Sequence, residues 1–192
     1  MSDQQPYEHL EMVWPQHLLN AQPFRPVPDG YRLRTYLPGD EAQFYPLMTL
    51  AGWPGWDDAK LAPWFARIVP DGWFFVVHEA SDKIVAAAMG IHSHAPPHPF
   101  GGELGWVAGD PEHAGKGLGA VVVSAVTSRL IAGGYKNIHL YTEHWRFPAL
   151  SIYFKLGYIP YLYNAKQPER WRVICEQINW PFTPEQWRQA DT

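Results

Sequence analysis

A glycine-rich stretch between two apolar runs, at residues 104–108 and 120–132, has the residue types best suited to binding a phosphate. The first run predicts a strand and the second a helix, so the glycines lie in a strand-to-helix turn. Gly115, Gly117 and Gly119 let the backbone approach a ligand without interference from Cβ atoms. The free N–H groups of the first helical turn favour an anion there. We therefore expect a phosphate-bearing cofactor at this turn.

Two common phosphate-binding motifs do not fit the stretch. A P-loop requires Gly-Lys followed by Ser or Thr, and here Lys116 is followed by Gly117. The dinucleotide fingerprint G-x-G-x-x-G requires a longer gap before its third glycine than the one before Gly119. A glycine-rich connection without any ligand remains the alternative, because short motifs also match by chance.

The stretch resembles the acyl-CoA pyrophosphate loop of the GNAT family of N-acetyltransferases, whose pattern is Arg/Gln-x-x-Gly-x-Gly/Ala shortly after a strand-ending proline. Pro111 and the alternating glycines fit this pattern, whereas Ala114 stands where the Arg or Gln is expected. The resemblance implies that acetyl-CoA binds to this loop and to the strand before it. The implied cofactor residues are Val107, Gly109, Ala114, Gly115, Lys116, Gly117, Leu118, Gly119 and Ala120.

A second motif of the same family occurs further along the chain. The family's pattern is Asn-x-x-Ala-x-x-x-Tyr-x-x-x-Gly-Phe/Tyr, and Ala149, Tyr153, Gly157 and Tyr158 occupy the matching positions. Arg146 stands where the Asn is expected; the resemblance implies that it too is a cofactor-binding residue, with an altered hydrogen bond to the cofactor. Because the two motifs match independently and in the right order, the resemblance favours a ligand-binding loop over an empty one.

The chemistry that this resemblance implies is acetyl transfer from a thioester to an amine by direct attack in a ternary complex. Tyr153 is implied as the acid that protonates the leaving thiolate, with simple packing in the core as the alternative. Glu103 is implied as the base that takes the proton from the amine. A water chain, Glu143 or the histidines of residues 92–99 are alternative bases. Strand alternation predicts that Glu103 shares a face with Gly105, Val107 and Gly109.

The acceptor is the part of the site that the sequence describes least. The resemblance implies that Trp53, Trp56 and Tyr161 line its pocket, where aromatic rings near Asp57 and Asp58 would suit a cationic amine. Packing of the tryptophans against the domain is the alternative. We expect the primary amine of an unidentified small molecule as substrate. A protein lysine or N-terminal acetyltransferase and a non-catalytic acyl-CoA sensor are the competing hypotheses.

Composition excludes several other classes of protein. The 192 residues are 46% hydrophobic and 18% charged, which predicts a globular chain, and no apolar run is long enough to span a membrane. A net charge of −4 argues against nucleic-acid binding. The polar N-terminus and the single Cys175 predict a cytoplasmic protein. No metal is expected at the histidines of residues 92–99, because no carboxylate or thiolate accompanies them.

The predicted elements lie in the order strand, two helices, three strands, helix, strand, helix and two strands. This order resembles that of the GNAT family, which implies the α/β GNAT acyl-CoA N-acyltransferase fold, a mixed six- to seven-stranded sheet flanked by helices, over residues 31–192. Residues 1–30 are predicted as an irregular arm laid over that domain, with a short strand near residues 10–14. The strands at 103–109 and 138–143 flank a helix and should be parallel. The exposed edges of the final strands could pair with a second copy of the chain, so a homodimer is a further expectation.

The remaining predicted elements follow from apolar periodicity and breaker residues. Strands are predicted at 31–36, 73–79, 83–91, 158–163 and 171–178, and helices at 44–51, 61–68, 118–132 and 148–156. Residues 92–99 are predicted as a long loop, and a short helix is expected from Thr183. Asp40 is predicted to cap the first helix.

Overall fold

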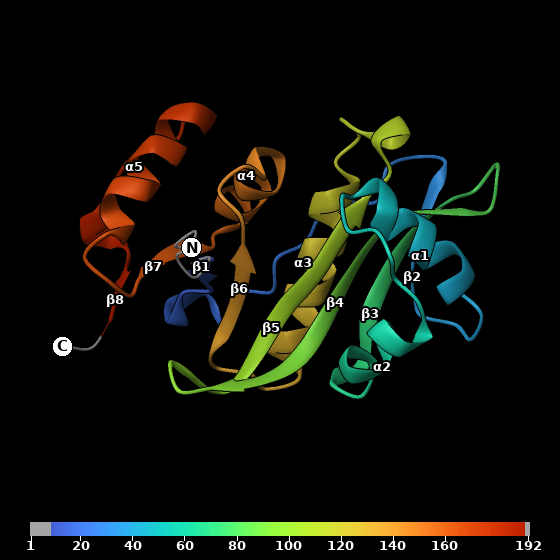
Figure 1. The fold of residues 1–192 in the computed structure, drawn as a ribbon, viewed down its shortest axis with the longest axis horizontal. Helices are drawn as coiled ribbons and strands as arrows, with labels where there is room; N and C mark the ends of the chain where they lie inside the picture. The colour runs from blue at the N-terminus through green and yellow to red at the C-terminus, as the bar shows by residue number, and fades with distance from the viewer. Residues whose placement is uncertain (1–8, 191–192) are drawn as a thin grey trace, which may run out of the picture.

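A computed structural model describes residues 9–190 of the chain as one mixed sheet of eight strands with helices on both faces (Figure 1). The strand order is β2-β3-β4-β5-β6-β1-β7-β8. The strands are β1 (Leu10–Val13), β2 (Tyr31–Thr35), β3 (Ile68–His78), β4 (Lys83–Ala95), β5 (His98–Gly109), β6 (Ile138–Thr142), β7 (Ile159–Leu162) and β8 (Arg188–Gln189). The helices are α1 (Glu41–Leu50), α2 (Asp58–Phe65), α3 (Leu118–Ala132), α4 (Phe147–Leu156) and α5 (Gln167–Ile178).

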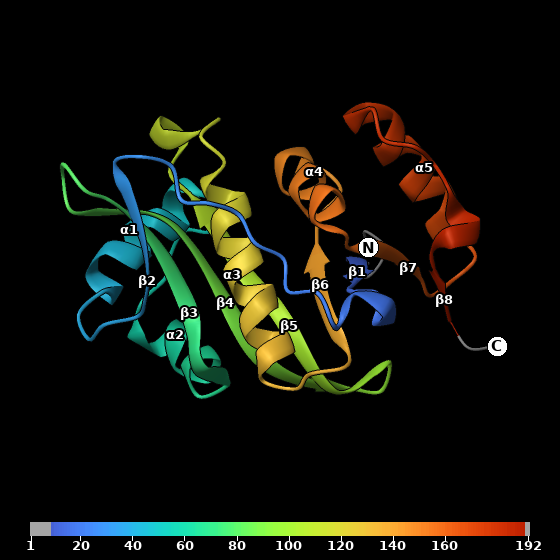
Figure 2. The ribbon, with the colours of Figure 1, turned by 180° about the vertical axis from the view of Figure 1, so that it is seen from behind.

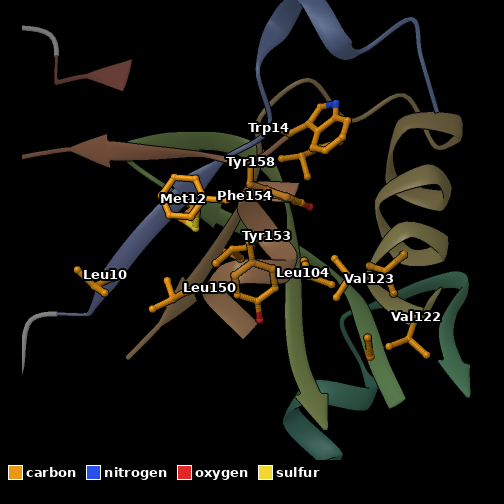
Figure 3. Close-up of a cluster of buried hydrophobic side chains, with 14 of the residues drawn as sticks. Leu10, Met12, Trp14, Leu104, Val122, Val123, Leu150, Tyr153, Phe154 and Tyr158 are labelled. Carbon is orange, nitrogen blue, oxygen red and sulfur yellow. The ribbon is translucent and has the colours of Figure 1, made fainter. Parts of the chain in front are cut away.

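The sheet separates two hydrophobic clusters. Helices α1 and α2 cover one face, where Phe44, Trp73 and Phe75 are buried (Figure 1). Helix α3 covers the other face (Figure 2), where the consecutive Val121–Val123 are all buried. A helix whose sides are nearly all buried tolerates β-branched residues, because packing outweighs their low helix propensity. Figure 3 shows that β1 and α4 extend this second cluster.

Residues 171–178 form a helix and not the predicted strand. Trp171, Ile174 and Cys175 are buried at i, i+3 and i+4 within α5, while the residues between them face solvent. Pro168 occupies the first turn of this helix and Asn179 ends it in the left-handed conformation, with φ 51°. The apolar and charged residues that suggested a strand therefore alternate along the boundary between the buried and the exposed face of a helix.

The segment before Tyr31 contributes to the sheet itself. Strand β1 lies between β6 and β7, antiparallel to both, and its four residues are buried. The short strand predicted near residues 10–14 is therefore confirmed, but it lies inside the sheet and not over the domain, and together with β8 it gives eight strands in place of six or seven. Residues 19–30 do cross over α3 (Figure 2), where Ser128 donates to the carbonyl oxygen of Pro23 at 2.6 Å. Residues 1–8 lie outside the described part.

The histidine-rich segment is a hairpin and not the predicted long loop. Strand β4 continues to Ala95, Pro96 and Pro97 make the turn, and β5 begins at His98. The turn at Pro96 and Pro97 therefore interrupts the strand structure for only two residues. Elsewhere β5 and β6 are parallel, as predicted, with Gly102 opposite Ile138. The short helix expected from Thr183 is a single 3₁₀ turn, Pro184–Gln186.

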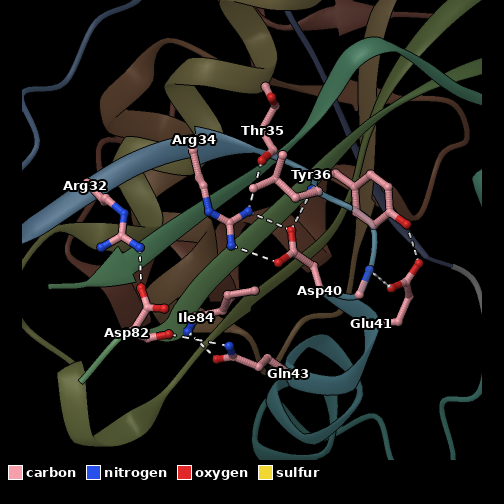
Figure 4. Close-up of polar contacts among 11 residues, drawn as sticks. Arg32, Arg34, Thr35, Tyr36, Asp40, Glu41, Gln43, Asp82 and Ile84 are labelled. Carbon is pink, nitrogen blue, oxygen red and sulfur yellow. Dashed lines mark hydrogen bonds and ion pairs between the residues drawn. The ribbon is translucent and has the colours of Figure 1, made fainter.

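Asp40 precedes α1 but does not cap it. Its carboxylate accepts two hydrogen bonds from Arg34, at 2.6 and 2.8 Å, and one from the backbone N–H of Leu37 at 2.7 Å (Figure 4). Burial raises the pKa of Asp40, but these hydrogen bonds outweigh burial and leave it below its ordinary value. The network fixes the turn between β2 and α1, and with it the position of the helix beside the sheet.

We expect Asp40→Asn to reduce the free energy of unfolding by about 2 kcal/mol, because it weakens hydrogen bonds between charged groups. A lowered pKa in the folded state means that this contribution is present above the ordinary pKa of an aspartate and is lost as the pH falls through the lowered value. Urea titrations at pH 7 and pH 3 should therefore show a difference between wild type and variant that shrinks in acid. An equal difference at both pH values would contradict this account.

Candidate active site

A cleft opens between β5 and β6 because these parallel strands pair over only two positions. Gly102 lies opposite Ile138 and Glu103 opposite His139, and beyond this pair the strands diverge (Figure 1). The cleft holds a cavity of about 740 Å³. It is lined by His9, Ala51, Trp53, Trp64, Glu103, Leu104, Gly105, Trp106, Val107, Gly109, Tyr141, Thr142, Glu143, Trp145, Arg146, Pro148, Ala149 and Tyr153. The cleft leaves the edge of β5 unpaired along the cavity.

A β-bulge at Trp106 shapes the β5 wall of the cleft. Ala87 pairs with Ala108 and Met89 with Gly105, so three residue steps on β5 oppose two on β4. Trp106 has a positive φ of 52°, a conformation that a bulky side chain rarely adopts. The bulge also reverses the alternation, since Val107 packs with the α3 cluster and Ala108 with the α1 cluster. The prediction that Val107 shares a face with Glu103 is therefore wrong.

The predicted phosphate loop has the backbone geometry of an anion site. Gly115 and Gly117 both have φ 78°, and a Cβ atom at either would meet nothing within 4 Å. Helix α3 begins at Leu118 without a side-chain cap. Within the described residues, no acceptor bonds the backbone N–H groups of residues 115–120, and Val121 is the first to bond within the helix. These groups and the helix dipole favour an anion at this position.

Ala114 and Lys116, which flank Gly115 in the loop, contribute differently to the anion site. Ala114 ends a 3₁₀ turn, Pro111–His113, and offers only its backbone. The ammonium group of Lys116 donates to the hydroxyl of Tyr31 at 2.8 Å, and that hydroxyl lies 2.8 Å from Nδ1 of His113. Lys116 is thus held beside the loop by Tyr31, and the backbone N–H groups remain the main attraction for an anion.

Glu103 lies at the closed end of the cleft, where β5 and β6 are still paired. Burial raises its pKa above the ordinary value, while a hydrogen bond with Ser93 and the charge of Arg67 partly oppose that rise. The guanidinium of Arg67 is 3.8 Å from its carboxylate. A carboxylate with a raised pKa that lines a cavity has the properties of a general base.

Tyr153 lines the same cavity from α4 and is 5% exposed. It belongs to the cluster that contains Leu104 and Leu150 (Figure 3). Burial raises the pKa of its hydroxyl well above the ordinary value, and the charge of Arg146 opposes that rise only in part. The hydroxyl is therefore protonated at neutral pH and able to donate a proton into the cavity.

The parallel pairing of β5 and β6 and the glycine turn before α3 are both as the sequence predicted. A comparison with protein-family models finds the Acetyltransferase (GNAT) family over residues 40–158. The chain belongs to the GNAT family of acetyltransferases. The matched region includes α1 to α4 and therefore both the phosphate loop and Tyr153.

Relatives of this GNAT chain include curated proteins named mycothiol acetyltransferase. The one from Nocardia farcinica is 33% identical over 145 residues, which are 70% of this chain and 47% of the relative. The one from Paenarthrobacter aurescens is 26% identical over 167 residues, 80% of this chain and 51% of the relative. The chain thus spans about half the length of the curated relatives that it matches.

Solved structures agree on the fold. A GCN5-related N-acetyltransferase from Sphaerobacter thermophilus superposes with a TM-score of 0.58 and 21% identity, over 82% of this chain and 51% of that chain. A tandem GNAT protein from the clavulanic acid biosynthesis pathway gives a TM-score of 0.57 and 16% identity, over 79% and 50%. At these identities the likeness supports the GNAT fold alone.

The residues predicted to bind the acceptor separate into two groups in this GNAT structure. Trp53 lines the cavity, whereas Trp56 and Tyr161 are buried outside its lining. The ring centroid of Trp56 is 4.7 Å from that of Trp106, and the ring of Tyr161 is 5.6 Å from that of His98. Of the three residues, Trp53 alone lines this cavity, while Trp56 and Tyr161 pack against other aromatic rings.

Several cavity residues were not singled out from the sequence. Trp106 is the centre of a tryptophan cluster, with ring centroids 5.7 Å from Trp53 and 4.9 Å from Trp64. His9 and Tyr141 approach the cavity from the far side of the cleft. His9 comes from the segment before β1, so only the insertion of that strand brings it here. The aromatic alternation of β6 was the one available signal for Tyr141.

Within residues 9–190, no three His, Cys, Asp or Glu side chains are grouped to hold a metal ion. In the same range, no helix combines the length and the apolar character that crossing a bilayer requires.

We expect Gly117→Ala to weaken acetyl-CoA binding about tenfold, because a left-handed alanine is strained and relaxes out of the geometry that aims the N–H groups. Gly134, at the other end of α3, has φ 83° and equally open surroundings, so Gly134→Ala is the matched control. Both variants should lose about 1 kcal/mol of stability, and only Gly117→Ala should change the Kd measured by calorimetry. Equal Kd values for the two variants would argue against this loop as the phosphate site.

Proposed function

We propose that the chain is an acetyl-CoA-dependent N-acetyltransferase that transfers an acetyl group to the primary amine of a small molecule by direct attack in a ternary complex. The cleft between β5 and β6 carries the proposal, because Glu103, Tyr153 and the unpaired edge of β5 meet in one cavity. The names of the curated relatives support acetyl transfer as the reaction. A small acceptor fits a concave cleft of about 740 Å³ better than a protein chain does.

The residues of the loop and of β5 suit acetyl-CoA, which supplies an acetyl group activated as a thioester. The free N–H groups of residues 115–120 would hold its diphosphate. The edge of β5 from Leu104 to Gly109 would pair with its extended arm as an added strand does. Gly109 favours this approach, since a Cβ atom there would meet nothing within 4 Å.

Glu103 and Tyr153 would each carry out one of the proton transfers of the reaction. The carboxylate of Glu103 accepts the proton that an ammonium substrate must lose before its nitrogen attacks. The hydroxyl of Tyr153 would donate a proton to the sulfur as the C–N bond forms and the C–S bond breaks, and the second proton that the attacking nitrogen loses would restore the hydroxyl. An unpaired backbone N–H of β5 stabilises the negative charge that develops on the carbonyl oxygen. The tryptophans at the mouth, Trp53 and Trp64, contact the body of the amine.

Two measurements test this function in sequence. Isothermal titration with acetyl-CoA should give saturable binding, and its absence would refute the proposal. Thiol release in a panel of amines, read together with the product masses, should then identify an acetylated small amine. Binding without release across the panel would favour the acyl-CoA sensor, and release only with lysine-bearing peptides would favour a protein acetyltransferase.

A further inference from the structure

Arg146 crosses the cleft at the position where the family motif has an asparagine. Its guanidinium carbon lies 3.6 Å from the ring centroid of Trp53, and one of its nitrogens donates to the carbonyl oxygen of Ala51 at 3.2 Å. A second nitrogen pairs with the carboxylate of Glu143. All four residues line the cavity. The contacts therefore form a tie between the loop after α1 and the segment before α4, here called the Arg146 tie.

The Arg146 tie joins two parts of the molecule that the sheet leaves apart. Ala51 and Trp53 follow α1, which packs over β3 to β5. Glu143 and Arg146 follow β6, on the other side of the point where β5 and β6 diverge. Because the strands pair only at Gly102 and Glu103, a contact across the open end constrains how far the two walls separate.

The chemistry of the side chain suits this role. A planar guanidinium stacks on an indole and donates hydrogen bonds along its edge at the same time, which an ammonium group cannot do. Glu143 neutralises the charge and uses one edge of the group, so little of Arg146 is left for an anionic ligand. Trp53 in turn contacts Trp106 on the β5 bulge. A fixed Trp53 therefore gives the acceptor end of the cavity a rigid aromatic wall.

We propose that Arg146 is a positioning residue, which acts through Trp53 to fix the width and the aromatic wall of the acceptor end. The proposal rests on the proposed function, because it assigns that end of the cavity to the amine. The Arg146 guanidinium contacts Trp53, Ala51 and Glu143, and none of these residues belongs to the phosphate loop. Its loss should therefore affect acceptor binding more than acetyl-CoA binding.

The test compares Arg146→Ala, Arg146→Lys and Lys60→Ala. Lys60 is the matched control, because its ammonium lies 5.3 Å from the ring centroid of Trp56 in the same loop without crossing the cleft. With the panel amine of highest turnover, Arg146→Ala should raise the acceptor KM about tenfold and change the Kd for acetyl-CoA by less than about threefold. Arg146→Lys should behave like the alanine variant, and Lys60→Ala like wild type.

Hydrogen exchange of the protein without ligands supplies a readout that does not depend on turnover. Arg146→Ala should speed exchange of residues 51–56, and adding Arg146→Ala to Trp53→Ala should raise the acceptor KM no further than Trp53→Ala alone does. A raised acetyl-CoA Kd with an unchanged acceptor KM would overturn the proposal, because Arg146 would then be a cofactor ligand. Unchanged exchange in residues 51–56 would overturn it as well. If no amine is acetylated while exchange responds as expected, the proposed function fails and the tie itself stands.

Discussion

Glu103→Gln is expected to lower kcat/KM for the amine by about 10²–10⁴-fold, the usual contribution of a positioned general base. The glutamine keeps the shape of the side chain, so the cavity and acetyl-CoA binding should be retained. In wild type, activity should fall as the pH decreases through the raised pKa of Glu103, because only the ionised carboxylate accepts a proton. The variant should lack this acid limb. Steady-state rates between pH 5 and 9 measure both effects.

The control for this variant is Glu79→Gln, since Glu79 is exposed at the end of β3 and should leave the pH profile unchanged. Stability gives an independent check. A carboxyl whose pKa is raised by burial destabilises the folded state once it ionises, so removing the charge should leave the melting temperature equal or higher. Turnover of Glu103→Gln within threefold of wild type would assign the base to a water chain or another group.

The elements that sequence analysis predicted correctly are those with local chemical signals. Gly115 and Gly117 lie in the predicted strand-to-helix turn before α3, and both adopt a left-handed conformation there. Pro148 lies in the first turn of α4, and Gly157 ends that helix with φ 115°. In each case a residue with special backbone properties determines the local structure, and no distant contact is needed to recognise it.

The elements that sequence analysis missed depend on distant partners. Trp171, Val173 and Cys175 alternate as a strand would, and the helix is recognisable only from its ends at Pro168 and Asn179. A short strand near residues 10–14 was predicted, but its place in the sheet was not, because that place is fixed by pairing with β6 and β7. The periodicity of a short segment does not show which strands of the sheet it will pair with.

The acceptor end was the least predictable part of the site for the same reason. A tryptophan with a positive φ has no local signature, and Trp106 is held in that conformation by rings from the loop after α1 and from α2. The sequence did not distinguish Trp53 from Trp56, although only Trp53 reaches the cavity. Which tryptophan faces a ligand is decided by how the clusters pack.

Tyr153→Phe is expected to lower kcat by about 100-fold, because it removes the proton donor for the leaving sulfur. The phenyl ring fills the same space, so the core around Leu150 should remain packed. Burial keeps the pKa of this hydroxyl high, and the defect should therefore be nearly constant from pH 6 to 9. The measurement is kcat under saturating acetyl-CoA and amine.

Tyr158→Phe is the matched control for loss of a buried hydroxyl. The Tyr158 hydroxyl lies 2.8 Å from that of Thr127 in the core and away from the cavity lining, so this variant should lose about 1 kcal/mol of stability and keep its kcat. An acetyl thioester of a more acidic thiol separates the acid role from packing, because its thiolate leaves without protonation. With that donor the Tyr153→Phe defect should shrink to a few-fold. A defect of the same size with both donors would assign Tyr153 to the shape of the cavity and not to proton transfer.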